Sequence, residues 1–523
     1  MRRFLLTALL LASSSAAPQE PTFSAGTRLV QVDTVVRNSK GPVANLRKED
    51  FSLLDNGKPQ KIAVFSVRSA RSSVASAVPL PAGAASNRLN SRGETPASAT
   101  ILLIDRLNTP ISDQPYANRK IIKFLQNRGN RDSIGIYTLG NRVRVIQDLT
   151  NDPDRLDRAV KLLKPEDVAR LKADVQLDPT GDAVTDGMLA RFIEALEDFT
   201  VQNKVETTQH AFEDIARHLA SVPGRKNLIW VSGSFPLFIQ RAHYNVDSSP
   251  EMEKAARALN DANVAVYPVD ARGLAGTLSL GGPVASAESN QSSKCPPVLL
   301  ACSPPGVREP AGFDTMNFLA ALTGGRAFYN TNGIEDSIGK AVEDAELTYT
   351  LGFYPPEASQ DGTNHKLVVK VSARGVSVHH RETYLAFKAN TAPRERLTLR
   401  QLLDDPLDAT QIGLLAQAAP DESRPGSERI QVTIDLHDLQ LQHESAHRTG
   451  EVAVSFFPER LGKVLTRTIR IDIPDDQFVA ALQQGIIVID AVETAGKPTG
   501  VRIVAQDAAT GTAGSLRLNI GAE

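Results

Sequence analysis

The sequence has little of what several classes of protein require. Only 2 of its 523 residues are cysteine, which excludes a scaffold held together by many disulfides. Aromatic residues make up 5% of the chain and the formal net charge is −2, so the base-stacking surfaces and basic patches of nucleic-acid-binding proteins are not expected. After residue 17 there is no stretch of about 18 apolar residues that could cross a membrane as a helix. The composition therefore predicts a soluble globular protein of several domains.

The N-terminus has the features of a secretory leader. Arg2 and Arg3 precede an apolar run from Phe4 to Ala12, and small residues follow as far as Ala17. This order is typical of a signal peptide, which we assign to residues 1–17. A retained membrane anchor is the alternative, but the run is too short to span a bilayer. We expect an exported protein, periplasmic or extracellular, without stable membrane insertion once the leader is removed.

The two cysteines, Cys295 and Cys302, lie in a stretch rich in proline, serine and glycine. Export permits a disulfide between them, and that bridge would close a small loop and stabilise the fold only modestly. Free thiols are the alternative. A metal site is not expected here, because no further cysteine or nearby histidine completes a set of ligands.

Patterns typical of β structure frame the middle of the chain. Residues 27–68 alternate apolar and polar positions, and Asn56-Gly57 is a strong hairpin signal, so we expect an N-terminal β segment. It is too short to bury a core alone and could pair with the strand patterns of residues 347–387. Residues 69–100 are rich in small and polar residues without periodicity, and we interpret them as a flexible linker. Residues 393–523 contain short alternating strands, which predict a C-terminal β-sandwich domain.

Residues 101–346 alternate strand and helix patterns, which predicts an α/β domain. Parallel strands need helical crossovers, so helices should cover both faces of a doubly wound, mostly parallel sheet. Gly140-Asn141 leaves too little chain for a crossover and predicts one antiparallel edge strand. The insertion 165–204 is expected to be helical or irregular surface. The predicted strands are 101–105, 133–139, 143–147, 227–232, 264–270 and 326–329, with helices over 207–222 and 250–263.

Several blocks of sequence together resemble one family, the bacterial VWFA-related proteins of acidobacterial type. The blocks are Glu49-Asp50-Phe51, Asp55-Asn56-Gly57-Lys58, Asp105-Arg106-Leu107-Asn108-Thr109-Pro110, Pro223-Gly224-Arg225-Lys226-Asn227-Leu228-Ile229-Trp230 and Thr348-Tyr349-Thr350-Leu351-Gly352-Phe353-Tyr354-Pro355. The resemblance covers residues 27–387 and implies an exported protein with a von Willebrand factor A (VWA)-like domain flanked by β modules. It implies no particular ligand.

The resemblance also implies a metal-ion-dependent adhesion site at the carboxyl end of the central sheet. In such a site loop oxygens hold Mg²⁺, and a carboxylate of a partner protein completes its ligands. The corresponding residues in this chain are Asp105 and Thr109 from the first loop, Thr207 or Thr208 from the second, and Ser232 from the third.

This copy of the site is degenerate. Leu107 stands where the family has a serine, and Ser232 where it has an aspartate; Asn108 is not expected to compensate, because its position aims it elsewhere. Fewer oxygen ligands attract a dication less, so we expect no cofactor, with weakly held Mg²⁺ as the alternative. Without metal, Asp105 and Thr109 would hydrogen-bond the neighbouring loops. In either case we expect Asp105 to face open solvent, where a guest molecule could dock.

His443-Glu444-Ser445-Ala446-His447 matches the His-Glu-x-x-His motif of zinc peptidases. That chemistry needs both histidines on one face of a helix. Here apolar residues alternate from Ile430 to Leu436 and Gly450 follows the motif, so it is expected on a loop or strand end. In that conformation the spacing does not bring both rings to one metal ion, and we assign no catalytic residues.

Taken together, these features predict an exported, non-enzymatic protein that binds an unidentified protein partner through a VWA-like domain. Two alternatives stay open. One is an exported zinc metallopeptidase that uses His443, Glu444 and His447; the other is a VWA scaffold with a purely structural role. Whether the His443–His447 segment is helical or extended discriminates the peptidase from the other two.

Overall fold

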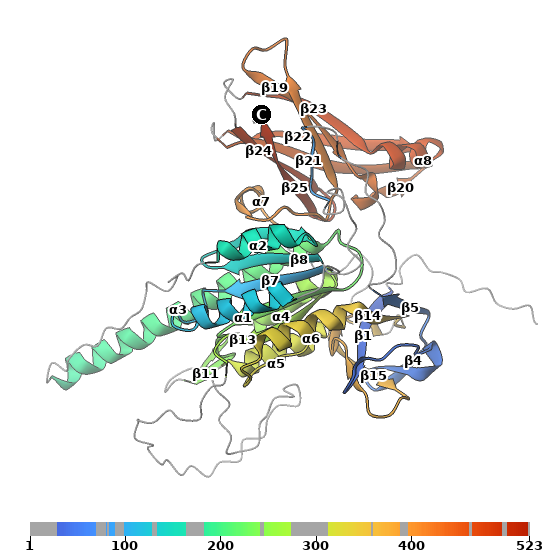
Figure 1. Ribbon diagram of the computed structural model, residues 1–523. Helices are drawn as coiled ribbons and strands as arrows, with labels where there is room; N and C mark the ends of the chain where they lie inside the picture. Colours follow the sequence, from blue (N-terminus) through green and yellow to red (C-terminus); the bar gives the residue numbers. More distant parts are fainter. Residues whose placement is uncertain are drawn as a thin grey trace, which may run out of the picture.

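The chain forms three parts, with a central α/β part between two parts built of strands (Figure 1). The predicted class, α/β with additional β modules, is confirmed at this level. The predicted signal peptide and both cysteines lie outside the described residues. The computed structural model describes residues 29–69, 80, 83–88, 99–127, 133–163, 182–240, 245–273, 312–356, 359–386, 396–459, 463–493 and 499–520.

The central sheet has five strands in the order β13-β10-β7-β8-β9. All neighbours pair in parallel except β9, which is antiparallel to β8, so the predicted mostly parallel sheet with one antiparallel edge is confirmed. Residues 326–329, predicted as a further strand, form only a single bridge, between Phe328 and Val269. The strands are β7 (Ala99–Asp105), β8 (Ser133–Leu139), β9 (Val143–Thr150), β10 (Lys226–Ser232) and β13 (Val264–Asp270). Two short strands, β11 (Phe238–Gln240) and β12 (Asn245–Asp247), form a separate ribbon.

Helices cover both faces of this sheet, and for this reason β7, β10 and β13 are buried along their whole length. Ile101 and Leu103 of β7 pack with α3, α4 and α5, whereas Leu102 and Ile104 pack with α1, α2 and α6. The helices are α1 (Gln114–Asn127), α2 (Pro153–Lys161), α3 (Ala183–Leu219), α4 (Ser249–Asp261), α5 (Phe313–Thr323) and α6 (Ile334–Glu346).

Helix α3 begins much earlier than the helix predicted over 207–222. Part of the insertion 165–204 forms its N-terminal half, which projects away from the body of the protein (Figure 1). The C-terminal half is buried through Phe212, Ile215 and Leu219. Periodicity identified the buried half because only that half has a sheet to pack against.

The N-terminal segment and the strands after the central part form one unit. β1 and β5 flank β14, and β3 pairs with β15, so residues of 27–68 and 347–387 share a core. Asn56 and Gly57 have φ of 47° and 78°, the mirror-image turn that the Asn-Gly pair predicts. The elements are β1 (Val30–Asn38), β2 (Gly41–Pro42), η1 (Lys48–Asp50), β3 (Phe51–Asp55), β4 (Lys58–Gln60), β5 (Val64–Ser69), β14 (Leu347–Phe353), β15 (Asn364–Val371), β16 (Ser377–His379) and β17 (Thr383–Leu385).

The C-terminal part consists of two packed antiparallel sheets, as the alternating strand patterns predict. One sheet has the order β23-β19-β18-β6, the other β20-β21-β24-β25 with β22 beside β21, and their apolar faces form one core. Its elements are α7 (Leu399–Asp404), β18 (Leu414–Pro420), β19 (Ser427–Ile434), η4 (Leu436–Asp438), β20 (Gln442–Glu444), β21 (His447–Pro458), β22 (Leu465–Pro474), α8 (Asp475–Gln484), β23 (Ile486–Glu493), β24 (Thr499–Asp507) and β25 (Ala513–Ile520).

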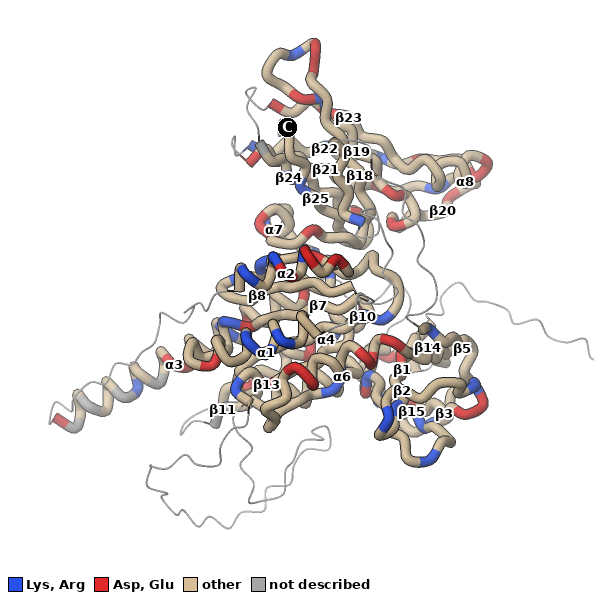
Figure 2. The backbone as a smooth tube through the Cα atoms, viewed as in Figure 1, with Lys and Arg blue, Asp and Glu red and all other residues tan. Residues whose placement is uncertain are grey.

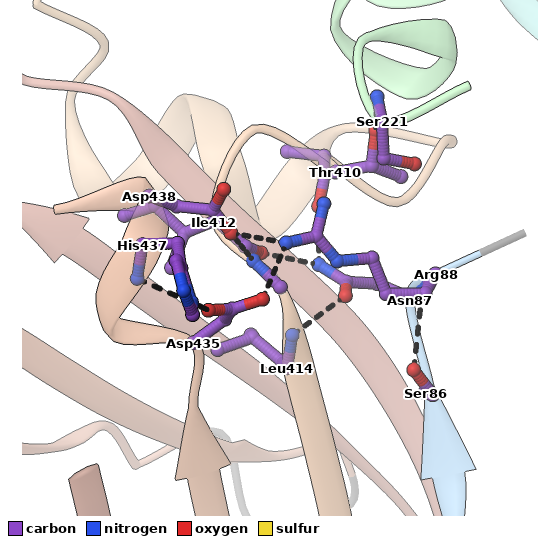
Figure 3. A network of polar contacts seen from close by, with 12 residues as sticks. Ser86, Asn87, Arg88, Ser221, Thr410, Ile412, Leu414, Asp435, His437 and Asp438 are labelled. Atoms are coloured by element: carbon purple, nitrogen blue, oxygen red, sulfur yellow. Dashed lines mark hydrogen bonds and ion pairs between the residues drawn. The ribbon is translucent and has the colours of Figure 1, made fainter. Parts of the chain in front are cut away.

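The interpretation of residues 69–100 as a flexible linker is wrong for its middle. Ala85 and Ser86 form β6, which adds to β18 at the edge of the C-terminal sandwich. Asn87 donates from Nδ2 to two carbonyl oxygens and accepts at Oδ1 from the backbone N–H of Leu414, each at 2.7–2.8 Å (Figure 3). Arg88 pairs with Asp435 and Asp438. Composition favoured a linker because these contacts are made with residues more than 300 positions away.

The C-terminal part also contacts the end of α3. His218 Nδ1 lies 2.8 Å from the carbonyl oxygen of Asp408, and the Thr410 hydroxyl donates to the carbonyl of His218 at 2.9 Å. Arg217 forms ion pairs with both Asp214 of the same helix and Asp405. These contacts join the central sheet's longest helix to the β-sandwich.

Among the residues that the structure describes, no helix combines the length and the apolar character needed to cross a membrane.

Candidate functional site

The candidate site lies at the carboxyl edge of the central sheet, between β7 and β10. Crossovers leave these two neighbouring strands in opposite directions along the sheet, and such a switch point is where open α/β sheets bind ligands. Asp105 ends β7 and Ser232 ends β10, and Thr208 approaches from α3. The parallel register thus brings together residues that are far apart in the sequence.

Asp105 is the centre of a closed hydrogen-bond network. One oxygen, Oδ1, accepts from the backbone N–H of Asn108 at 2.9 Å. The other, Oδ2, accepts from Asn108 Nδ2 at 2.8 Å, Trp230 Nε1 at 2.9 Å and the Ser232 hydroxyl at 2.8 Å. Four donors therefore satisfy the carboxylate from within the protein.

The side-chain amide of Asn108 links the end of β7 to helix α3; the threonine expected on a second loop lies within that helix. The amide nitrogen also donates to the Thr208 hydroxyl at 3.0 Å, and that hydroxyl donates in turn to the carbonyl of Lys204 at 2.8 Å. Because the single hydroxyl proton of Thr208 is used on Lys204, Thr208 must accept from Asn108, which sets the orientation of the amide. The expectation that Asn108 is aimed elsewhere is wrong: the turn after β7 points it back at Asp105.

Thr109 holds the third loop in place. Its hydroxyl accepts from the backbone N–H of Gly233 at 2.9 Å, and the Ser232 hydroxyl accepts from the N–H of Ser234 at 2.8 Å. A Cβ on Gly233 would lie 2.6 Å from the carbonyl oxygen of Asn108, so the two loops pack backbone against backbone. Of the two threonine candidates on α3, Thr208 faces this network, and Thr207 lies about 100° further round the helix.

The expectation that Asp105 faces open solvent is wrong. Its side chain is 1% exposed, and Thr208 and Ser232 are fully buried. Leu107 contributes to this closure, because it packs in the same apolar cluster as Phe212 and Trp230. A serine there could not make those apolar contacts.

Burial also sets the electrostatics of the site. It raises the pKa of the Asp105 carboxyl, and the hydrogen bonds from Asn108, Ser232 and Trp230 oppose that rise without cancelling it. A Mg²⁺ ion needs oxygen ligands with free lone pairs. Here the N–H groups of Asn108, which repel a cation, point at the two oxygens that would bind it. The arrangement does not fit Mg²⁺.

Sequence reasoning missed Asn108 and Trp230 as members of the site. Trp230 is the only tryptophan of the chain, and its side chain is fully buried. A buried indole N–H needs an acceptor. A single tryptophan in one buried strand, with an aspartate at the end of the adjacent strand, could therefore have predicted this hydrogen bond. Asn108 gave no comparable signal, because its role depends on the conformation of the turn.

The His443–His447 segment is a β-hairpin, as expected from the flanking strand pattern. Ser445 and Ala446 form its two-residue turn with φ of 49° and 67°. Glu444 pairs with His447 across the hairpin and His443 pairs with Arg448, so the two histidines lie on opposite faces. His443 contacts Asp475 at 2.7 Å, and His447 contacts Asp472 at 2.5 Å. Among the described residues, no group of three or more histidine, cysteine, aspartate or glutamate side chains is placed to hold a metal ion.

A cleft of about 850 Å³ lies elsewhere, where the three parts of the chain meet. Its lining mixes acidic and basic side chains, among them Asp33, Glu213, Lys254 and Arg257. In the view of Figure 2, Lys and Arg are interspersed with Asp and Glu along the described part of the backbone. The cleft does not have the one-sided charge that attracts nucleic acid.

Comparison with known proteins adds little. No protein-family model and no curated protein matches the chain. Similar solved structures include an aerotolerance-related membrane protein from Bacteroides fragilis NCTC 9343 with multiple mutations to serines, and the conserved hypothetical protein BatB from Bacteroides thetaiotaomicron. Each is 13% identical over 47% of this chain and 98% of its own, with a TM-score of 0.25. Proximal thread matrix protein 1 from the mussel byssus is 9% identical over 52% of this chain and 49% of its own, also at 0.25. Values this low carry no argument about function.

Proposed function

We propose that this chain is an exported, non-enzymatic protein-binding protein, and that its central part is a VWA-like domain whose binding does not depend on a metal ion. The strand order and the position of Asp105, Thr208 and Ser232 at the switch point support the VWA-like assignment. Export rests on the leader pattern of residues 1–17.

One observation carries the metal independence. Asn108 Nδ2 lies 2.8 Å from Asp105 at the end of β7 and 3.0 Å from Thr208 on α3, the two elements that a cation would otherwise link. The amide supplies the positive end of a dipole where a metal-dependent site places Mg²⁺. These hydrogen bonds hold the loop after β7 in place without an ion. Loops that are positioned by a well-packed scaffold are suited to binding.

The rim of the site offers a contact surface for a protein. Pro110 and Ser112 are exposed in the loop after β7, and the side chain of Ile111 between them is 45% exposed. An exposed aliphatic side chain above a well-packed network fits the centre of a protein interface better than a small-molecule pocket.

Two measurements test the proposal. Titration of the purified chain with Mg²⁺ in a calorimeter should give no heat of binding, and bound proteins recovered from the source organism should be the same with and without EDTA. Ile111→Asp should remove those proteins, whereas Val479→Asp, at a side chain of α8 that is 67% exposed, should not. Saturable binding of Mg²⁺, or capture that EDTA abolishes, would sink the proposal.

The alternatives give different results. A purely structural VWA scaffold predicts that Ile111→Asp changes no interaction. A zinc peptidase predicts that replacing His443 and His447 with alanine lowers zinc content and hydrolysis. The geometry of the hairpin favours neither bound zinc nor hydrolysis, because the two rings point away from each other.

A further inference from the structure

The function proposed above gives no role to the N-terminal part of α3, which projects from the body of the protein. Val201 packs against the edge of the core, and Val205 is the first buried residue of the helix among those described, so residues 183–200 stand clear of the core (Figure 1). At 1.5 Å per residue this segment extends for roughly 27 Å. We refer to residues 183–200 as the stalk.

One side of the stalk is an exposed row of large apolar side chains. Val184, Met188, Phe192 and Phe199 are each between 61% and 66% exposed. Ala195 lies between the two phenylalanines, so the row 188–192–195–199 has the alternating spacing of four and three residues that forms a helix–helix seam. Single exposed apolar residues are common, but a contiguous row of this size marks an interaction surface.

We propose that the stalk binds the stalk of a second copy of this chain, side by side and antiparallel. In that arrangement Phe192 lies opposite Ala195 of the second copy, so a large ring meets a small side chain in each of the two central layers. Met188 lies opposite Phe199 by the same symmetry. The two-fold axis passes midway between residues 193 and 194.

Charge complementarity supports the antiparallel direction. Arg191 and Asp198 flank the apolar row on the same side of the helix. In the antiparallel pair Arg191 faces Asp198 of the second copy, and the contact occurs twice. A parallel pair would instead put Arg191 beside Leu196 and stack Phe192 on Phe192 and Ala195 on Ala195, which leaves both the charge and the volume unmatched.

The decisive experiment measures self-association of the full-length mature chain by sedimentation velocity over a wide range of concentration. We expect a reversible dimer, and Phe192→Asp should weaken it by about tenfold or more because a charge enters the seam. Val479→Asp is the matched control, since it makes the same change at an equally exposed side chain of α8. The Phe192→Asp chain should keep its melting temperature as a monomer, because the residue makes few contacts in a single copy.

A charge exchange tests the direction. Arg191→Glu and Asp198→Lys should each weaken the dimer, and the double variant should restore it, because each contact is rebuilt with its signs reversed. A chain that sediments as a monomer at every concentration overturns the proposal. So does a dimer that Phe192→Asp leaves intact, a double variant that is not restored, or a monomer that cosediments with phosphatidylcholine vesicles through Phe192. None of these measurements involves Ile111 or the capture of a partner protein, so failure of the stalk proposal can be distinguished from failure of the proposed function.

Discussion

Trp230 on β10 donates its indole N–H to the carboxylate of Asp105 on the neighbouring strand β7, with 2.9 Å between Nε1 and Oδ2. Both side chains are buried, and the Ser232 hydroxyl and the Asn108 amide donate to the same carboxylate oxygen. The residue that a metal site would use to attract a cation is here the common acceptor that ties three segments together. Removal of the Asp105 carboxylate should therefore lower the stability of the fold.

Asp105→Ala should lower the free energy of unfolding by at least about 3 kcal/mol, because it leaves several buried donors without an acceptor. Ser232→Ala removes one donor of four and the acceptor of the Ser234 N–H, and should cost about 1–2 kcal/mol. Urea unfolding followed by tryptophan fluorescence measures both values, and Trp230, as the only tryptophan, reports directly on the site. Equal losses for the two variants would contradict the central role of Asp105.

Leu107→Ser places a hydroxyl where the proposed VWA-like site would have one, but it should not create Mg²⁺ binding. Asn108 still directs its N–H groups at Asp105 and Thr208, and the change removes a leucine from the apolar cluster around Trp230. We expect a loss of about 2–4 kcal/mol in stability and no heat of binding in a calorimetric Mg²⁺ titration. If this single variant binds Mg²⁺ as the folded chain, the amide is not what blocks the cation.

His218 should make the contact between α3 and the C-terminal part sensitive to pH. Its two ring nitrogens lie 2.8 Å from the Asp408 carbonyl oxygen and 3.5 Å from Asp148, and only the protonated ring donates to both. Burial, the largest cause, lowers the pKa of His218, but the contacts with Asp148 and Asp408 together outweigh it and the pKa is raised. Burial would likewise raise the pKa of Asp148, but the contacts with His218 and the hydrogen bonds from Leu149 and Tyr137 lower it.

The sign of the effect follows from these shifts. A raised pKa for His218 stabilises the fold fully below its unfolded pKa of about 6.5, and this contribution is lost as pH rises through the folded value. The lowered pKa of Asp148 stabilises the fold above its unfolded value of about 3.9 and is lost in acid. The midpoint of urea unfolding should therefore fall from about pH 6 to pH 9, and His218→Gln should remove most of that slope. An unchanged slope in the variant would assign the dependence to other groups.

Asn87→Ala should detach β6 from the C-terminal sandwich. The side chain makes three short hydrogen bonds to backbone groups, and its loss leaves them buried without partners. We expect a loss of about 3 kcal/mol for the C-terminal part, against about 1 kcal/mol or less for Arg88→Ala, whose ion pairs are partly exposed to solvent. Hydrogen exchange at the amides of β18 measures both, and protection that is equal in the two variants would show that Asn87 is not the main contact.

The local patterns of this chain were sufficient to predict much of its fold. The unbroken apolar run that ends in Asp105 predicted a strand buried on both faces, and the Asn56-Gly57 pair predicted a hairpin. The strand pattern around His443 and His447 predicted a strand end rather than a helix for this segment. Each of these depends on residues that are neighbours in the sequence, so spacing alone carries the information.

The character of the site was decided only by tertiary structure. The resemblance implied that Asp105, Thr207 or Thr208, and Ser232 lie at one edge of the sheet. Neither it nor the spacing could show that Asn108 turns back, that Trp230 reaches across from β10, or that the carboxylate is closed off from solvent. Spacing also could not show that Asn87 docks on the distant C-terminal sandwich. These contacts join residues brought together by the folding of the whole chain, and a pattern along the sequence contains no record of which distant donor meets which acceptor.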